Sequence, residues 1–206
     1  MGGPRKLDQG DFIRMNLPRE FWPARSDIIA KSAYPSIHNY GTKIGEMLRE
    51  GLGFVFYGPA GVGKTGAAAV LAKIAKCYGH SVLFVTISDL RELARSRIDF
   101  DEKQSMNDRS RDVELLILDN LRIEDAKETI VNAASLEALL EHRGTWKRST
   151  IITTRMTDGE LTKAFSGLME KARAMCAFLP IQGENLRDKA EKELEQRLIV
   201  RPTEKK

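Results

Sequence analysis

The sequence predicts an α/β protein with a parallel five-stranded sheet flanked by helices. Short apolar runs alternate with segments whose apolar residues recur at helical spacing, as in a parallel sheet covered on both faces. A glycine-rich segment, Gly58 to Thr65, follows one of these runs and precedes a helical pattern. A later apolar run, Leu115 to Leu118, ends in Asp119. These three observations together predict a sheet that carries a phosphate-binding site at the carboxyl ends of its strands.

Composition limits the class of protein and its setting. The chain has 206 residues, of which 42% are apolar and 30% charged, as expected for one domain with a full core. The net charge of +4 permits a polyanionic partner without requiring one. Cys77 and Cys176 are isolated, which argues against a disulfide framework and for a reducing compartment. Without a signal peptide or a membrane-spanning run, we expect a cytoplasmic protein that makes no membrane contact.

The first elements lead to the glycine-rich segment. Residues 1–35 contain four prolines and predict an irregular lead-in, in which Trp22 serves as a packing anchor. Ile37 to Glu50 has the spacing of an amphipathic helix that ends at Gly51 and Gly53. Phe54 to Tyr57 then predicts the first buried strand. A strand, a glycine loop and a helix follow one another in the order that a phosphate-binding loop needs.

Eight residues fit the P-loop pattern G-x-x-x-x-G-K-[ST]. Glycines let backbone N–H groups turn towards phosphate oxygens, and the helix N-terminus adds partial positive charge. The lysine can reach the β- and γ-phosphates, and the following hydroxyl can bind Mg²⁺. We therefore expect ATP and Mg²⁺ as ligands. The predicted nucleotide-binding residues are Gly58, Pro59, Ala60, Gly61, Val62, Gly63, Lys64 and Thr65, and the predicted metal ligands are Thr65 and Asp119.

The remaining elements alternate in the same way. Gly79 is predicted to end the helix after the P-loop, and Ser88 or Asp89 to cap the helix after the second strand. The predicted strands are 81–86, 113–118, 149–154 and 175–180, with a polar, irregular or briefly helical segment at 100–111. Helices are predicted over 127–142, over 159–174 with a possible break, and over 184–198, before a frayed tail at 201–206.

Asp119 and Asn120 decide what the site can do. An acid at the end of a buried strand beside a P-loop is the Walker B pattern, which holds the metal. Many ATPases have a second acid next, to activate water, but here Asn120 occupies that position. An amide orients water and accepts no proton at neutral pH, so we expect weak or partner-dependent hydrolysis. Glu124 and Asp125 are substitutes for that acid, although capping of the next helix explains them as well.

The order and spacing of several stretches resemble the DnaC/IstB group of AAA+ ATPases, and most of all the DnaC-type helicase loaders. The similar stretches are 53–65, 81–93 ("SVLFVTISDLREL"), 115–121 ("LLILDNL"), 143–155 ("RGTWKRSTIITTR") and 183–187 ("GENLR"). The resemblance implies a AAA+ core over residues 36–200 with a minimal C-terminal lid. It also implies a nucleotide held between neighbouring subunits, and hence a homo-oligomer that forms with ATP.

The resemblance assigns roles to further residues. The strand that ends at Arg155 resembles sensor 1, but the family usually has Asn at this position, so Thr153 or Thr154 is the alternative sensor. Arg173 is the preferred arginine finger, with Lys171 as the alternative, because a guanidinium bridges phosphate oxygens. Arg187 matches the sensor 2 arginine. The predicted catalytic residues are therefore Lys64, Asp119, Asn120, Arg173 and Arg187.

Partners follow from the same resemblance. In the family, the region corresponding to Arg91 through Arg111 faces a channel that binds single-stranded DNA; the arginines concerned are Arg91, Arg95, Arg97, Arg109 and Arg111. Cellular loaders carry a helicase-binding domain before the ATPase core. No large domain precedes Trp22 here, which fits a phage-type minimal loader or a shortened chain.

We therefore expect an ATP-dependent loader that oligomerises and delivers a replicative DNA helicase onto single-stranded DNA. The close alternative is an IstB-like transposition helper that binds duplex DNA. A small-molecule kinase and a scaffold that binds ATP without hydrolysing it are further alternatives. His38, His80 and His142 show no metal-binding spacing.

Overall fold

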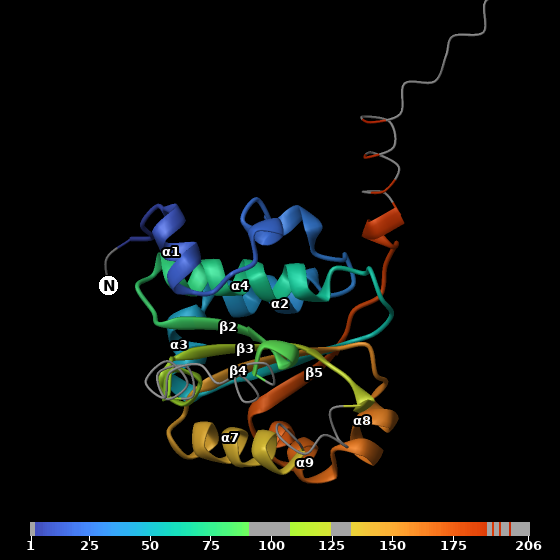
Figure 1. The fold of residues 1–206 in the computed structure, drawn as a ribbon. Coiled ribbons are helices and arrows are strands. Elements are labelled where there is room, and N and C mark those ends of the chain that lie inside the picture. The colour runs from blue at the N-terminus through green and yellow to red at the C-terminus, as the bar shows by residue number, and fades with distance from the viewer. Residues whose placement is uncertain are drawn as a thin grey trace, which may run out of the picture.

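The structure is a computed structural model that describes residues 3–90, 108–124 and 133–188, together with residues 191, 194 and 198. Its centre is a parallel sheet of five strands in the order β2-β3-β4-β1-β5 (Figure 1). Helices α2 and α4 cover one face of the sheet, and helices α7 and α9 cover the other. The predicted fold class is confirmed.

The strands lie close to their predicted positions. They are β1 (Gly53–Tyr57), β2 (Val82–Thr86), β3 (Leu115–Leu121), β4 (Ser149–Thr154) and β5 (Cys176–Pro180). The third strand was predicted to end at Leu118, and that boundary is wrong. The strand continues through Asp119 and Asn120 to Leu121, with a register shift against β4 between Leu118 and Leu121. The acid predicted to follow the strand therefore lies within it.

The helices differ more from the predictions. They are α1 (Gln9–Arg14), α2 (Tyr34–Thr42), α3 (Ile44–Glu50), α4 (Lys64–Cys77), α7 (Ala133–Thr145), α8 (Asp158–Ala164) and α9 (Ser166–Met175), with 3-10 turns η1 (Arg19–Phe21) and η2 (Ser26–Ile28). The single helix predicted from Ile37 to Glu50 is wrong, because the backbone at Lys43 leaves helical geometry and separates α2 from α3. The segment predicted over 159–174 as a helix or a broken helix is broken, at Phe165 between α8 and α9.

Two capping arrangements also depart from the sequence reading. The predicted irregular lead-in contains α1, whose N-terminus has a capping box between Asp8 and Asp11. After β2, Thr86 Oγ1 accepts from the Asp89 backbone N–H, and the Asp89 carboxylate accepts from the Thr86 N–H. Thr86 is therefore the cap of the helix that follows β2, with Asp89 as its reciprocal partner.

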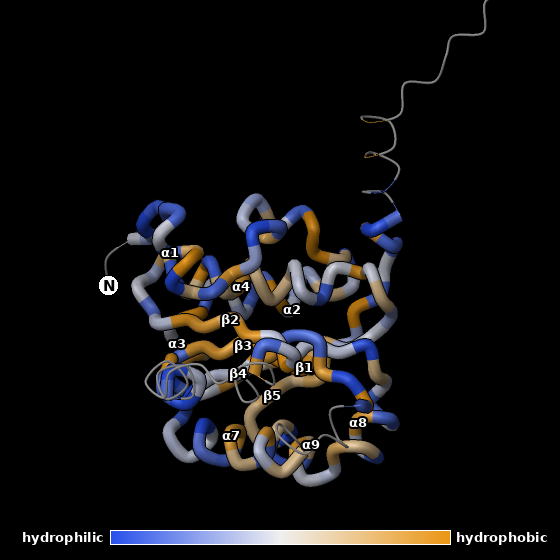
Figure 2. Tube along the Cα trace, viewed as in Figure 1, coloured by the Kyte–Doolittle hydropathy of each residue, from blue (hydrophilic) through white to orange (hydrophobic). Residues whose placement is uncertain are grey.

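Side chains alternate along the strands into two cores. Phe56, Phe84 and Ile117 face α2, α4 and the N-terminal segment. Val55, Leu116 and Ile152 face α7 and α9 on the other side. Figure 2 shows the apolar colouring concentrated on the strands between the two helix layers. This double burial explains the nearly continuous apolar runs of the sequence.

The N-terminal segment packs against the free edge of β2 and then crosses α4. The Phe84 N–H donates to Met15 O at 2.7 Å, and Asn16 Nδ2 donates to Phe84 O at 3.0 Å. Further on, the Lys73 ammonium donates to the carbonyls of Phe21, Trp22 and Ala24. Trp22 is the expected packing anchor, because its ring lies 5.2 Å from that of Phe12 and its indole N–H bonds Leu17 O. These contacts carry the segment to the carboxyl edge of the sheet.

Several predictions fall outside the described residues: Arg91, Arg95, Arg97, Asp125, the start of the helix predicted at 127 and the tail at 201–206. Cys77 and Cys176 are free thiols, as expected. Among the described residues, no helix combines the length and the apolar character needed to cross a bilayer.

Candidate nucleotide-binding site

The loop between β1 and α4 has the backbone geometry of a phosphate cradle. Gly58, Gly61 and Gly63 adopt φ values of 134°, 79° and 90°, in a region that residues with a side chain rarely enter. A Cβ atom at Gly61 would lie 1.7 Å from Asn185 Oδ1, and one at Gly58 would lie 2.4 Å from Ile181 O. Both glycines are therefore required by the close approach of the C-terminal segment. The loop ends at the first turn of α4, whose N-terminus favours bound anions.

Lys64 is buried at the start of α4. Its ammonium group donates to Gly58 O at 2.8 Å and to Pro59 O. Burial, together with the positive charges of Arg155 and Arg187, lowers the pKa of Lys64 to about 8, and the negative charge of Asp119 opposes this shift. A bound phosphate group would raise the pKa of Lys64 again, because it would give the ammonium a negatively charged partner.

Asp119 and Thr65, the predicted metal ligands, lie together. Thr153 Oγ1 donates to Asp119 Oδ1 at 2.6 Å, and the Thr65 hydroxyl lies beside the same carboxylate. Burial raises the pKa of Asp119 and the charge of Glu20 adds to this rise, whereas the hydroxyl groups of Thr153 and Thr65 oppose it. The described residues contain no cluster of three His, Cys, Asp or Glu side chains able to hold a metal. One carboxylate and one hydroxyl suit Mg²⁺, which takes its other ligands from phosphate and water.

Asn120 has an unusual backbone conformation that suits an asparagine. Its φ is 64°, in the left-handed region, where Asn is tolerated better than most residues. Its N–H donates to Thr153 Oγ1 at 3.0 Å, so one threonine holds both Asp119 and Asn120. The register shift in β3 produces this conformation. This backbone conformation therefore accommodates Asn at the position where many ATPases have a second acid.

These residues line one cavity of about 720 Å³ at the carboxyl edge of the sheet. Arg155 reaches the cavity from the end of β4, and Arg187 reaches it from the C-terminal segment. With Lys64, three cations therefore converge there. The Leu186 N–H donates to Gly61 O at 2.9 Å and fastens the C-terminal segment to the P-loop. Thr154, one of the two alternative sensors, also lines the cavity, but its hydroxyl donates to Leu121 O at 2.7 Å within the sheet.

The sequence reasoning missed the acidic residues of this cavity. Glu20 and Asp27 line it from the N-terminal segment, although they lie about a hundred residues before Asp119 in the chain. No spacing rule links them to the P-loop. Only the docking of the segment onto β2 and α4 brings them there.

The candidate trans-acting residues lie elsewhere. Arg173 forms an ion pair with Asp158 at 2.5 Å and lies 4.3 Å above the ring of Phe178. Lys171 pairs with Glu141 at 3.7 Å. Neither residue lines the nucleotide cavity, and neither does the exposed Glu124. The cavity therefore contains the predicted residues that act within the chain and lacks the two finger candidates.

Comparisons with known proteins agree with this geometry. Residues 46–194 match the profile of the family described as IstB-like ATP binding protein. The replicative helicase loader DnaC of Escherichia coli (strain K12) is 28% identical over 113 residues, which cover 53% of this chain and 45% of DnaC. The chain thus spans about half the length of the curated relatives it matches.

Solved structures share the fold. The crystal structure of DnaI superposes with a TM-score of 0.68 at 24% identity, covering 83% of this chain and 94% of that one. The DnaC helicase loader gives 0.65 at 22% identity, covering 80% and 100%. The replication initiator DnaA bound to AMPPCP and single-stranded DNA gives 0.65 at 16% identity, covering 90% and 58%. With the family profile covering most of the chain and the P-loop site in place, the protein belongs to the IstB-like ATP-binding family, within the DnaC/IstB type of AAA+ ATPases.

Proposed function

We propose that this protein is a helicase loader, which oligomerises with ATP and delivers a replicative DNA helicase onto single-stranded DNA. The observation that carries the proposal is the composition of the cavity. It holds the P-loop, the Thr65–Asp119 pair and three converging cations, while both finger candidates lie outside it. An arginine supplied by a neighbouring subunit would complete the site. ATP would then hold subunits together, and hydrolysis would release them.

Mg²⁺ would bind at Thr65 and Asp119. There it would neutralise the charge of the phosphate oxygens while the γ-phosphoryl group is transferred to water. Lys64, Arg155 and Arg187 would orient the triphosphate, with Arg155 at the place where the family's sensor 1 residue stands. Asn120 would orient the attacking water without taking its proton. Hydrolysis by the isolated chain is therefore expected to be weak, or to depend on a partner.

The test is a mass measurement by light scattering, with and without ATP·Mg²⁺, single-stranded DNA and a candidate helicase. We expect the parent chain to form larger species with ATP and to bind the helicase in that state. Lys64→Ala should remain at its nucleotide-free mass, because the triphosphate loses its central cation. Lys76→Ala, in the last turn of the same helix and outside the cavity, is the matched control and should assemble normally. Full assembly of Lys64→Ala would contradict the proposal.

Because the matching family profile is IstB-like, a second candidate function is that of a transposition helper that binds duplex DNA. A higher affinity for duplex than for single-stranded DNA in the presence of ATP would favour it. ATP turnover with nucleosides or nucleotides alone would favour a small-molecule kinase. ATP-dependent assembly without any turnover would identify a scaffold that binds ATP and does not hydrolyse it.

A further inference from the structure

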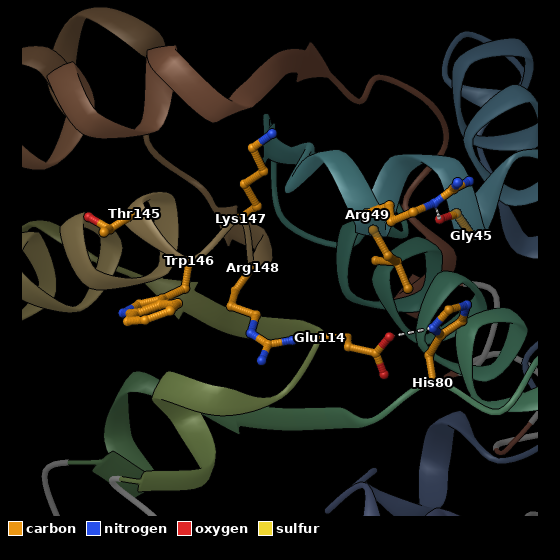
Figure 3. Close-up of a pocket in the computed structure, with 9 residues that line it drawn as sticks. Gly45, Arg49, His80, Glu114, Thr145, Trp146, Lys147 and Arg148 are labelled. Atoms are coloured by element: carbon orange, nitrogen blue, oxygen red, sulfur yellow. Dashed lines mark hydrogen bonds and ion pairs between the residues drawn. The ribbon is translucent and has the colours of Figure 1, made fainter.

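A second cavity, of about 540 Å³, opens at the opposite edge of the sheet. It lies where β2, β3 and β4 begin, whereas the nucleotide cavity lies where they end. Figure 3 shows its border: Trp146 at one end, the His80–Glu114 pair at the other, Arg148 between them, and Arg49 and Lys147 along a third side. These residues come from α3 and from three separate turns. None of them belongs to the P-loop site.

Trp146 is 66% exposed, which is unusual for a tryptophan. Its exposure does not come from a loose loop. The N–H groups of residues 146, 147 and 148 donate to His142 O, Gly144 O and Arg143 O at 3.2, 3.1 and 2.7 Å. Lys147 has φ 48°, and its Cα would lie 2.7 Å from a Cβ atom at Gly51. The backbone of the turn is therefore packed closely against the end of α3, and it carries the indole at the border of the cavity.

Arg143, at the base of this turn, is fully buried and holds the surroundings together. Its guanidinium donates to Thr150 Oγ1 and Ser149 O in β4. It also donates to three carbonyls in the segment that leads into β3, those of Ser110, Arg111 and Val113. A ring held on such a base can accept a planar partner with little loss of conformational entropy.

The border of the cavity carries unbalanced positive charge. Within the described part of the chain, no carboxylate lies within ion-pair distance of Arg49, Lys147 or Arg148. Glu114 is already engaged, because it accepts from the Ser81 N–H at 2.8 Å and lies 2.7 Å from His80 Nδ1. Arg111 extends the cationic border, since its guanidinium contacts His142 at 2.9 Å, and the His142 ring lies 6.4 Å from that of Trp146.

We propose that this cavity binds single-stranded nucleic acid, with a base stacked on Trp146 and the flanking phosphates on Arg49, Lys147 and Arg148. Proteins that bind single strands combine exposed aromatic rings, on which bases stack, with cations that contact the phosphates. A protein partner fits less well. The only aliphatic side chain in the lining is the buried Leu48, and the cores of protein interfaces are depleted in lysine. This inference goes beyond the proposed loader function, because the site requires neither ATP nor a helicase.

The chain contains two tryptophans, so Trp22→Phe leaves Trp146 as the only indole reporter. In this background and without ATP, titration with oligo-dT should quench the fluorescence saturably, and added salt should weaken the binding. Trp146→Ala, followed by the anisotropy of a labelled oligonucleotide, should lower the affinity about tenfold, and Trp146→Phe should restore most of it. Arg49→Ala should also weaken binding, whereas Lys163→Ala, on the exposed surface of α8, should not.

Four outcomes would overturn the proposal, and the last of them concerns the Trp146→Ala variant. The first is unchanged fluorescence at saturating oligonucleotide. The second is equal quenching by an abasic oligomer, which would mean a polyanion site without stacking. The third is quenching by an acidic peptide but not by oligo-dT, which would identify a protein-docking surface. Circular dichroism of each variant checks that the fold is retained. DNA binding that persists in Trp146→Ala at parental affinity would leave the loader function standing while refuting this site.

Discussion

At the scale of single residues, the protonation of Lys64 determines how nucleotide affinity depends on pH. Burial and two arginines lower its pKa to about 8, and a bound triphosphate would stabilise the charged form. Below pH 8 the ammonium is already present, so affinity should change little. Above pH 8 binding must take up a proton, so affinity should fall by up to about tenfold per pH unit. Titration with a fluorescent ATP analogue from about pH 7 to about pH 9.5 measures this slope.

Two variants separate Lys64 from other titrating groups. Arg155→Ala removes a nearby positive charge, so the pKa of Lys64 should rise and the break in the profile should move to higher pH. Lys64→Ala should bind weakly with a flat profile. A break at the same pH in Lys64→Ala would assign the titration to another residue.

Asn120 shows what the sequence reveals about this site and what it conceals. The pattern predicted a P-loop beside a Walker B acid, and Lys64, Thr65 and Asp119 line one cavity, because these two features have fixed places in a parallel sheet. The departure at Asn120 was read only as a catalytic deficit. Its φ of 64° depends on a register shift against β4, which is a tertiary feature without a local sequence signal.

At the scale of elements, α1 holds the N-terminal segment through one buried carboxylate. Asp11 accepts two hydrogen bonds from Arg5, at 2.7 and 2.6 Å, and one from Arg14 at 2.7 Å. The Arg5 guanidinium holds the pKa of Asp11 well below its usual range, against the opposing effect of burial. Because the folded-state pKa is depressed, this contribution to stability is present above the unfolded value of about 3.9 and is lost as the pH falls.

Asp11→Ala should therefore lower the free energy of unfolding by about 2 kcal/mol near neutral pH, since both arginines are partly exposed and can be hydrated. Urea denaturation measures this change. The Asp11→Ala substitution should also weaken ATP binding, because α1 precedes the segment that brings Glu20 to the cavity. Asp8→Ala removes the cap and a longer contact of 3.9 Å with Arg14, and should cost about 1 kcal/mol. Equal effects of the two substitutions would show that the ion pairs contribute nothing beyond the cap.

The elements that the sequence predicted well are those whose apolar residues form a clear local pattern. Strands β1, β2, β3 and β4 were predicted because burial on both faces produces apolar runs, whereas β5 is a partly exposed edge strand with a shorter apolar pattern. The break at Lys43 was missed because the apolar residues of α2 and α3 continue the same helical spacing across it. Helix α1 was missed because of its six residues only Asp11 is buried, so it shows no apolar period. Tertiary contacts, rather than propensity, determine these two features.

At the scale of the whole molecule, the two edges of the sheet carry different chemistry. The carboxyl edge gathers the nucleotide residues, and the amino edge carries Trp146 with its cations. Helix α9 runs towards the amino edge, where β5 begins, and Arg173 lies near its end. A ring or filament that repeats one contact between subunits joins two different surfaces of the chain, and a finger role for Arg173 requires that its surface meet the nucleotide cavity of the next chain. The ATP site would then be shared between two chains.

Mixing two inactive variants tests whether the site is shared. Lys64→Ala keeps Arg173 but loses its own nucleotide site, and Arg173→Ala keeps the site but loses the finger. Each alone should show almost no ATP hydrolysis. An equal mixture should recover up to about a quarter of the parental rate, because at most a quarter of the contacts pair an intact, ATP-bound site with an intact finger. Lys171→Ala mixed in the same way tests the alternative finger. Parental activity of Arg173→Ala alone would rule Arg173 out as the finger, and a mixture without recovery would place its action within its own chain, where it already pairs with Asp158.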